Sequence, residues 1–156
     1  MEHHTDEDEV GTLHKILLVG CESGGVHLID LRGRTILKSL KLYSAVNSVK
    51  FLNENTGAAG TQDGMLVIFS IPDMEIVHEI HDSNASVESL LPVRNGILCG
   101  KHDGACVWYG FDPMTNEICK EVIVLSGSDV DPINDMAKDN EYVYTAARDG
   151  CFESIP

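Results

Sequence analysis

Two short groups of histidines and carboxylates are the first candidates for chemistry in this chain. His78-Glu-Ile-His81 has the composition of a zinc-protease motif, but two residues rather than three separate its histidines. In a strand the two imidazoles lie on opposite faces, so we expect no shared metal ion. Asp129-Val-Asp-Pro-Ile-Asn-Asp135 is similar in composition to a calcium loop. Because Ile133 occupies a ligand position and the required glycine and distal glutamate are missing, we expect an ordinary loop.

The cysteines offer a second kind of chemistry. There are five, without any Cys-X-X-Cys pair or zinc-finger spacing: Cys21, Cys99, Cys106, Cys119 and Cys151. We expect them to be reduced and to serve mainly as small apolar side chains. A cysteine-dependent hydrolase acting through Cys99, Cys106 or Cys151 is an alternative, but no nucleophile motif supports it. The sequence therefore predicts a protein that is not an enzyme and that has no cofactor and no metal.

The elements that carry these residues repeat along the chain. Four times, an apolar strand runs into a turn of small residues that ends in glycine, and a second apolar strand follows. The turn-ending glycines are Gly25, Gly64, Gly104 and Gly150, spaced by 39, 40 and 46 residues. A period of about 40–45 residues, built from short strands and Asp-Gly turns, is typical of the blades of a WD40-type β-propeller.

Hydrophobic alternation predicts an all-β chain, and no segment shows a helical period. The predicted strands are Leu13–Cys21, Val26–Leu31, Thr35–Leu42, Val46–Leu52, Gly57–Thr61, Met65–Ile71, Glu75–His81, Val87–Val93, Gly96–Lys101, Ala105–Phe111, Ile118–Leu125, Ile133–Ala137, Tyr142–Ala147 and Cys151–Ile155. They form about four blades, of which the first lacks its inner strand and the last lacks its outer strand. Since propellers close with about four to eight complete blades, residues 13–156 are predicted to be part of a larger propeller.

The Asp-Gly pairs predict the geometry of the turns. A two-residue hairpin needs positive φ at both central positions, which glycine adopts freely and aspartate adopts more readily than most residues. We therefore assign a structural role to Gly25 and to the pairs Asp63-Gly64, Asp103-Gly104 and Asp149-Gly150.

The polar network that surrounds this aspartate in a WD repeat is mostly missing. That network joins the aspartate to a serine or threonine, a histidine and a tryptophan. In this chain Phe69 and Tyr109 occupy the tryptophan position, and the only tryptophan, Trp108, lies one residue early. The serine or threonine is expected four residues before the aspartate. Thr145 occupies this position, but Ala59 and Cys99 occupy the equivalent positions in the other repeats.

The net charge of −14 argues against sequence-independent binding to nucleic acid or to an anionic membrane. Residues 1–12 contain no lysine or arginine and are predicted to be a disordered acidic tail. A second acid-rich stretch contains Asp129, Asp131 and Asp135, which we predict to form a docking surface for a basic protein. No apolar run has the length of a signal sequence or a membrane span, so the expected location is the cytosol or the nucleus.

Several segments are more specific than the period alone. They are Lys15-Ile-Leu-Leu-Val19, Ala59-Gly-Thr-Gln-Asp-Gly64, Val87-Glu-Ser-Leu-Leu-Pro-Val-Arg94, Ser128-Asp-Val-Asp-Pro132, and Tyr142-Val-Tyr-Thr145 with Arg148-Asp-Gly150. In these segments the chain resembles the carboxy-terminal half of the proteasomal ATPase-associated factor family, which are WD-repeat proteins of the proteasome regulatory particle.

The resemblance implies a seven-bladed propeller that binds ATPase subunits of the 19S base. It also implies that the protein chaperones or inhibits assembly of the regulatory particle of the 26S proteasome. The alternative is a general WD40 adaptor that serves another multiprotein complex.

Overall fold

The structure is a computed structural model of the chain and describes residues 2–7, 13–112, 114–115, 117–123, 133–138, 142–147 and 152–155. Regular structure in this part of the chain consists entirely of β-strands. The predicted all-β class is therefore confirmed. Each strand predicted from hydrophobic alternation is present, with bounds that differ by at most a few residues. No helix of the described residues is long and apolar enough to cross a membrane.

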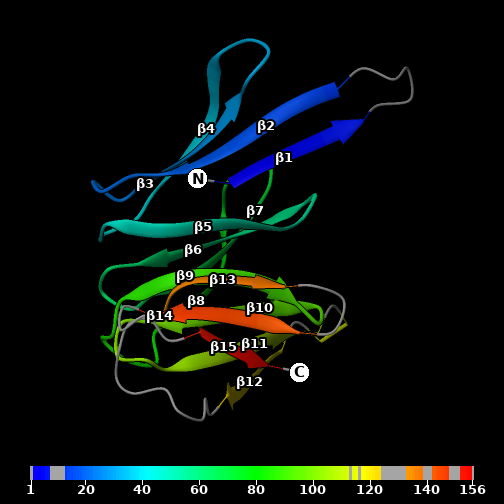
Figure 1. Cartoon of the computed structure of the whole chain (residues 1–156). Coiled ribbons are helices and arrows are strands. Elements are labelled where there is room, and N and C mark those ends of the chain that lie inside the picture. Colours follow the sequence, from blue (N-terminus) through cyan, green and yellow to red (C-terminus); the bar gives the residue numbers. More distant parts are fainter. Residues whose placement is uncertain are drawn as a thin grey trace.

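The strands form four antiparallel sheets that follow one another in chain order (Figure 1). The N-terminal sheet contains β1 (Glu2–Glu7), β2 (Leu13–Gly20), β3 (Gly25–Asp30) and β4 (Thr35–Lys41). The second sheet contains β5 (Val46–Asn53), β6 (Thr56–Thr61), β7 (Leu66–Ser70) and β8 (Ile76–Ile80). The third sheet contains β9 (Val87–Val93), β10 (Gly96–Lys101), β11 (Cys106–Phe111) and β12 (Ile118–Ile123). The fourth sheet contains β13 (Ile133–Lys138), β14 (Val143–Ala147) and β15 (Phe152–Ile155).

Strand β1 corrects part of the prediction of a disordered acidic tail over residues 1–12, since residues 2–7 form a strand, while residues 1 and 8–12 lie outside the described residues. It pairs with β2 in antiparallel register, from Glu2 opposite Leu18 to Glu7 opposite Leu13. The prediction considered only which side chains can be buried, whereas a strand is also held by backbone hydrogen bonds, which any sequence other than proline can form. Without β1, the inner edge of β2 would present a row of unpaired N–H and C=O groups. Strand β1 thus supplies the inner strand that was expected to be missing.

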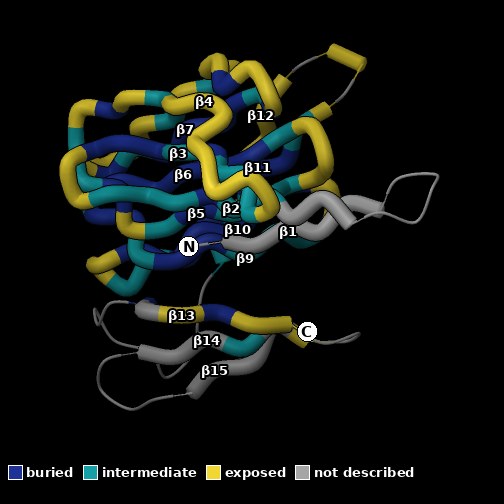
Figure 2. The backbone as a smooth tube through the Cα atoms, turned by 90° about the horizontal axis from the view of Figure 1, so that it is seen from above, coloured by how far each residue is buried: buried dark blue, intermediate teal, exposed yellow. Residues whose placement is uncertain are grey.

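The sheets pack face to face, and each junction has its own apolar core. The first core joins the N-terminal and second sheets around Leu28 and Phe69. The second core joins the second and third sheets around Ile68 and Ile97, and a smaller third core places Ile133 against the third sheet. Burial is concentrated in the middle strands of the sheets, while the outer strands β4 and β12 are exposed (Figure 2).

A repeated glycine allows neighbouring sheets to approach closely. Near the end of the second strand of three sheets, the glycine faces a β-branched residue at the start of the next sheet. The pairs are Gly20 with Val46, Gly60 with Val87, and Gly100 with Ile133. A Cβ atom at any of these glycines would lie less than 3.0 Å from the facing side chain. The contact explains why small residues precede each turn in the sequence.

Candidate interaction surface

Three described turns share one backbone geometry, which differs from the predicted two-residue hairpin. In the second sheet, Thr61 N donates to Met65 O at 3.0 Å and Gly64 N donates to Thr61 O at 3.2 Å. These bonds close a three-residue loop in which only the glycine is left-handed, with φ of 92°. Asp63 keeps a negative φ, so the requirement that we assigned to both residues of the pair applies to glycine alone.

The first and third turns repeat this pattern. Gly104 has φ of 84° in the third sheet, and Asp103 accepts a hydrogen bond from Ala105 N at 3.0 Å. In the N-terminal sheet the left-handed residue is Gly24, with φ of 97°, whereas Gly25 is the first residue of β3. The prediction of Gly25 as the turn glycine was therefore one residue late, because both glycines of the Gly-Gly pair fit the pattern equally well. Asp149 and Gly150 lie outside the described residues.

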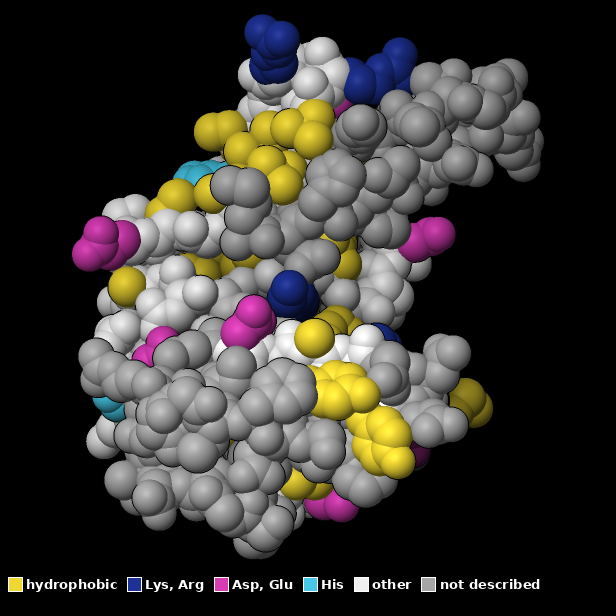
Figure 3. Space-filling view, in the orientation of Figure 1, with side chains coloured by type: hydrophobic (Ala, Val, Ile, Leu, Met, Phe, Trp, Pro, Cys, Tyr) yellow, Lys and Arg dark blue, Asp and Glu magenta, His cyan; other side chains and the backbone are white. Residues whose placement is uncertain are grey.

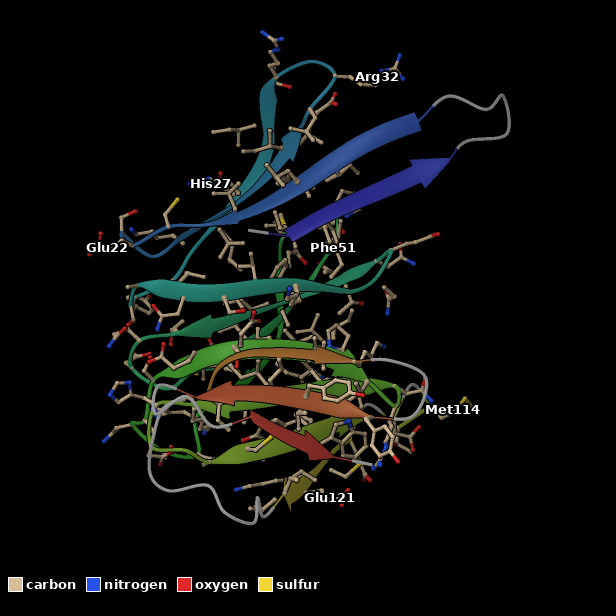
Figure 4. All side chains as sticks on the ribbon, viewed as in Figure 1. Glu22, His27, Arg32, Phe51, Met114 and Glu121 are labelled. Carbon is tan, nitrogen blue, oxygen red and sulfur yellow. The ribbon has the colours of Figure 1, made fainter. Side chains whose placement is uncertain are left out.

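These turns and the segments that lead into β5 and β9 form one end of the molecule, which we call the turn face. Backbone bonds tie each turn to the segment beside it, since Gln62 N donates to Ala45 O at 2.8 Å and His102 N donates to Ser86 O at 2.9 Å. The turn face is on the left in Figures 1 and 4, where Glu22 is labelled. The opposite end, with the loop that contains Met114, is on the right.

In the second sheet the polar network of the turn is local. The Thr61 hydroxyl donates a short hydrogen bond to the Asp63 carboxylate and accepts one from Met65 N at 3.0 Å. Asp63 N donates to the Ser44 hydroxyl at 3.1 Å. The position that the sequence suggested for the tryptophan of the network holds Phe69, which is fully buried and has no polar group.

In the third sheet the network joins β11 and β12 to the segment between β8 and β9. The Tyr109 hydroxyl donates to the Asp82 carboxylate, which also forms an ion pair with Lys120 at 3.1 Å. The hydrogen bond from Tyr109, followed by the contacts with Lys120, lowers the pKa of Asp82. Burial, followed by the bond to Asp82, raises the pKa of Tyr109 well above its ordinary value. Tyr109 therefore remains a neutral donor to a charged carboxylate over the physiological pH range.

A buried lysine lies beside this network and was not anticipated. Lys101 occupies the position that corresponds to Thr61 in the second sheet, and only 4% of it is exposed. Its ammonium group donates to the Ser83 hydroxyl at 3.4 Å, and its charge helps to lower the pKa of Asp82. The only sequence signal was the charged residue between two stretches that are otherwise apolar or small.

Of the three aspartates predicted to form an acidic docking surface, the structure places one. Asp135 is exposed on β13, and its carboxylate accepts a hydrogen bond from Met136 N at 2.9 Å. Asp129 and Asp131 lie outside the described residues. On the face seen in Figure 3, the described carboxylates are scattered rather than gathered in one patch.

The turn face carries further carboxylates that the prediction treated as architecture or overlooked. Asp63 and Asp103 are exposed beside their glycines, and Glu22 is exposed in the first turn. Glu88 contacts the His102 ring at 2.9 Å, so one of these acids has a cationic partner when the histidine is protonated.

Two of the candidate nucleophilic cysteines are poorly suited to that role. Burial raises the pKa of the Cys106 thiol to about 12 and raises the pKa of Cys99 further above its ordinary value. Since the thiolate is the nucleophile, both side chains are chemically inert at neutral pH. Cys119 is exposed on β12, and Cys151 lies outside the described residues.

The two histidines of the metal-like motif have separate surroundings. His78 stacks on Phe111 with ring centroids 5.6 Å apart, whereas the His81 ring contacts the Asp63 carbonyl at 3.1 Å. Within the described part of the chain, no group of three or more histidine, cysteine, aspartate or glutamate residues has the geometry of a metal site.

Comparison with known proteins identifies relatives of this chain. Proteasomal ATPase-associated factor 1 from Bos taurus and from Homo sapiens is 33% identical to this chain over 150 residues, and the factor from Gallus gallus is 32% identical. The predicted resemblance to the proteasomal ATPase-associated factors is confirmed. The match covers 96% of this chain but only 37% of each factor, so the chain spans little more than a third of the factors' length. No family model matches the chain.

Solved structures support the arrangement of the sheets. The chain is similar to the computationally designed Ika4 protein, with a TM-score of 0.72 and 17% identity over 90% of this chain and 84% of Ika4. It is also similar to the designed Ika8 protein, with a TM-score of 0.71 and 16% identity over 98% of this chain and 44% of Ika8. Both are designed β-propeller-like proteins, which supports a propeller-like arrangement of the sheets in this chain.

Proposed function

We propose that this chain is a non-enzymatic, propeller-like scaffold of the WD-repeat type that binds ATPase subunits of the proteasome base. In this proposal, it chaperones or inhibits assembly of the regulatory particle in the cytosol or nucleus. The observation that carries the proposal is the similarity to proteasomal ATPase-associated factor 1 along 96% of the chain. The name of these relatives states an association with proteasomal ATPases.

The architecture is consistent with a binding role. The sheets present loops at two ends, and the cysteine and histidine candidates for chemistry that the structure describes are either buried thiols or histidines with separate partners. A net charge of −14 favours encounter with a basic surface on the partner. We assign the contact to the acid-rich surface of Asp129, Asp131 and Asp135.

A pull-down of individual ATPase subunits by the full chain, at low and at moderate salt, tests the proposal. At least one subunit is expected to be retained at low salt, with retention falling as salt screens the charges. If no subunit is retained at low salt, the proposal fails. An unbiased interaction screen that returns other complexes without proteasome subunits would favour the general adaptor instead.

A triple reversal of Asp129, Asp131 and Asp135 to lysine tests the assigned surface. It is expected to weaken retention strongly. The matched control reverses Glu54, Asp73 and Glu117, which lie in loops at the end opposite the turn face. The control changes the net charge equally, so equal loss in both triple variants would point to overall charge rather than to a docking surface.

A further inference from the structure

A groove opens between the second and third sheets at the end opposite the turn face. Its volume is about 700 Å³, within the usual range for ligand sites, and β13 contributes to its rim. We call it the end groove and define it by the residues used below: Leu52, Ile68, His78, Arg94, Phe111 and Lys138.

The floor of the end groove is apolar and rigid. It is the open end of the second core, where buried Ile68 lies beneath the partly buried Leu52 and Phe111. The Phe111 ring stacks on His78 at an interplanar angle of 17°. A side chain that enters the groove therefore meets aliphatic and aromatic surface already in place.

Two cationic side chains, Arg94 and Lys138, lie at the rim of the end groove. The Lys138 ammonium donates to Pro92 O at 3.0 Å, which holds it beside the floor. Arg94 is exposed, and its guanidinium has no hydrogen-bond or ion-pair partner among the residues that the structure describes. Asp112 also lines the groove, and its carboxylate accepts a bond from Met114 N at 2.8 Å in its own loop. This bond is the main reason that the pKa of Asp112 is lowered.

The backbone conformation at Arg94 does not favour arginine over other residues. Arg94 and Asn95 have φ of 52° and 60° and join β9 to β10 as a two-residue turn, a conformation that favours asparagine or glycine at both positions. Arg34 has a similar φ of 54° in the turn between β3 and β4 and is not among the residues that line the end groove. The two arginines therefore form a matched pair that differ in their surroundings.

We propose that the end groove binds a peptide segment of a partner protein in which an apolar side chain lies next to a carboxylate. The apolar side chain rests on Phe111 and Leu52, and the carboxylate pairs with Arg94, whose planar fork suits a bidentate contact. Two cations are too few to follow a nucleic-acid backbone, which requires a row of phosphate contacts. The chain has a net charge of −14, and at the rim of the end groove two cations lie next to an apolar floor, which is the combination that such a peptide needs.

Fluorescence anisotropy with the full chain tests this proposal directly. The probes are four labelled octapeptides in a glycine–serine background, each with leucine, isoleucine, phenylalanine or tyrosine between two glutamates. Four counterparts carry glutamine in place of glutamate. At least one glutamate peptide is expected to bind about tenfold more tightly than its glutamine counterpart.

Variants of the rim separate binding from folding. Arg94→Asn is expected to weaken the binding of that peptide about tenfold while the melting temperature stays the same or rises, because asparagine suits the turn better. Lys138→Gln is expected to weaken it about threefold. The matched variant Arg34→Asn makes the same change of residue and backbone preference away from the groove and should leave binding unchanged.

Three results would overturn the proposal: no peptide binds, the glutamine peptides bind equally well, or Arg94→Asn and Arg34→Asn have the same effect. The anisotropy assay measures peptide binding to the end groove without ATPase subunits, so failure to retain ATPase subunits would leave this inference standing.

Discussion

The turns of the second and third sheets have the same backbone and different polar networks. Each is a three-residue loop closed by the same pair of hydrogen bonds, with a left-handed glycine at the same place. In the second sheet Thr61 satisfies Asp63 within the turn. In the third sheet the turn aspartate bonds only to its own loop, and a separate network joins Tyr109, Asp82 and Lys120 across strands.

The difference shows which part of the repeat is constrained. A left-handed backbone position admits few residues other than glycine, so the glycine recurs in each of the three described turns. Polar groups need partners of suitable chemistry, and many combinations of side chains provide them. The residues of the usual network are mostly missing from the sequence. Other residues at other positions therefore provide hydrogen-bond partners near the turns.

The largest expected effect comes from breaking what the two turns share. Gly64→Ala should destabilise the chain by about 2–3 kcal/mol, because a Cβ atom at this φ is strained and would collide with the backbone carbonyl of Ser83. Urea unfolding followed by the fluorescence of Trp108 measures the change. Gly33→Ala is the control, since Gly33 itself does not have a left-handed φ and the nearest neighbours of an added Cβ atom would be side-chain atoms. Equal losses in the two variants would contradict this account of the turn.

A smaller effect distinguishes the two networks. Asp82→Asn should cost about 1 kcal/mol, because Tyr109 and two lysines lose a charged partner. The same change at Asp63 should cost less than about 0.5 kcal/mol, since an amide oxygen still accepts the bond from Thr61. The comparison uses urea unfolding at neutral pH. A larger loss at Asp63 would mean that the local network is the more important one.

The smallest effect is the pH dependence expected from the hydrogen bond between Tyr109 and Asp82. The pKa of Asp82 is lowered in the folded chain, so its contribution to stability is present above about pH 4 and is lost as the pH falls through the folded value. The pKa of Tyr109 is raised, so its contribution is present below about pH 10 and declines as the pH rises further.

Melting temperatures of the chain and of Tyr109→Phe, measured from pH 3 to pH 11, test this expectation. The melting temperature of the variant should decline less above about pH 10, because phenylalanine has no hydroxyl to ionise. The second sheet already has a phenylalanine, Phe69, at this position. Parallel curves for the two proteins would show that the network does not respond to pH in this way.

Sequence reasoning succeeded where the local backbone conformation restricts the type of residue. The strands followed from alternation, and the glycines at 64 and 104 followed from their spacing and from the turns around them. It failed where several residues fitted equally well, as with Gly24 and Gly25. It also failed at β1, where pairing with a neighbouring strand outweighed an unfavourable composition.

The candidate surfaces were less predictable than the fold. The separation of His78 from His81 followed from strand alternation, but the stacking of His78 on Phe111 joins residues from two sheets. The end groove brings together residues from three sheets, and no spacing in the sequence indicates that Arg94 and Lys138 share a rim.

The sequence by itself determined the all-β class, the repeat and the resemblance to the proteasomal ATPase-associated factors, because each is written in local patterns of residue type. The tertiary structure alone decided which polar groups meet, which thiols and lysine are buried, and where an open groove remains. These depend on how one sheet packs against the next, through contacts such as Gly60 with Val87 and Gly100 with Ile133. Such contacts join residues that are distant in the chain, and their consequences for pKa and for binding arise only after the sheets have packed.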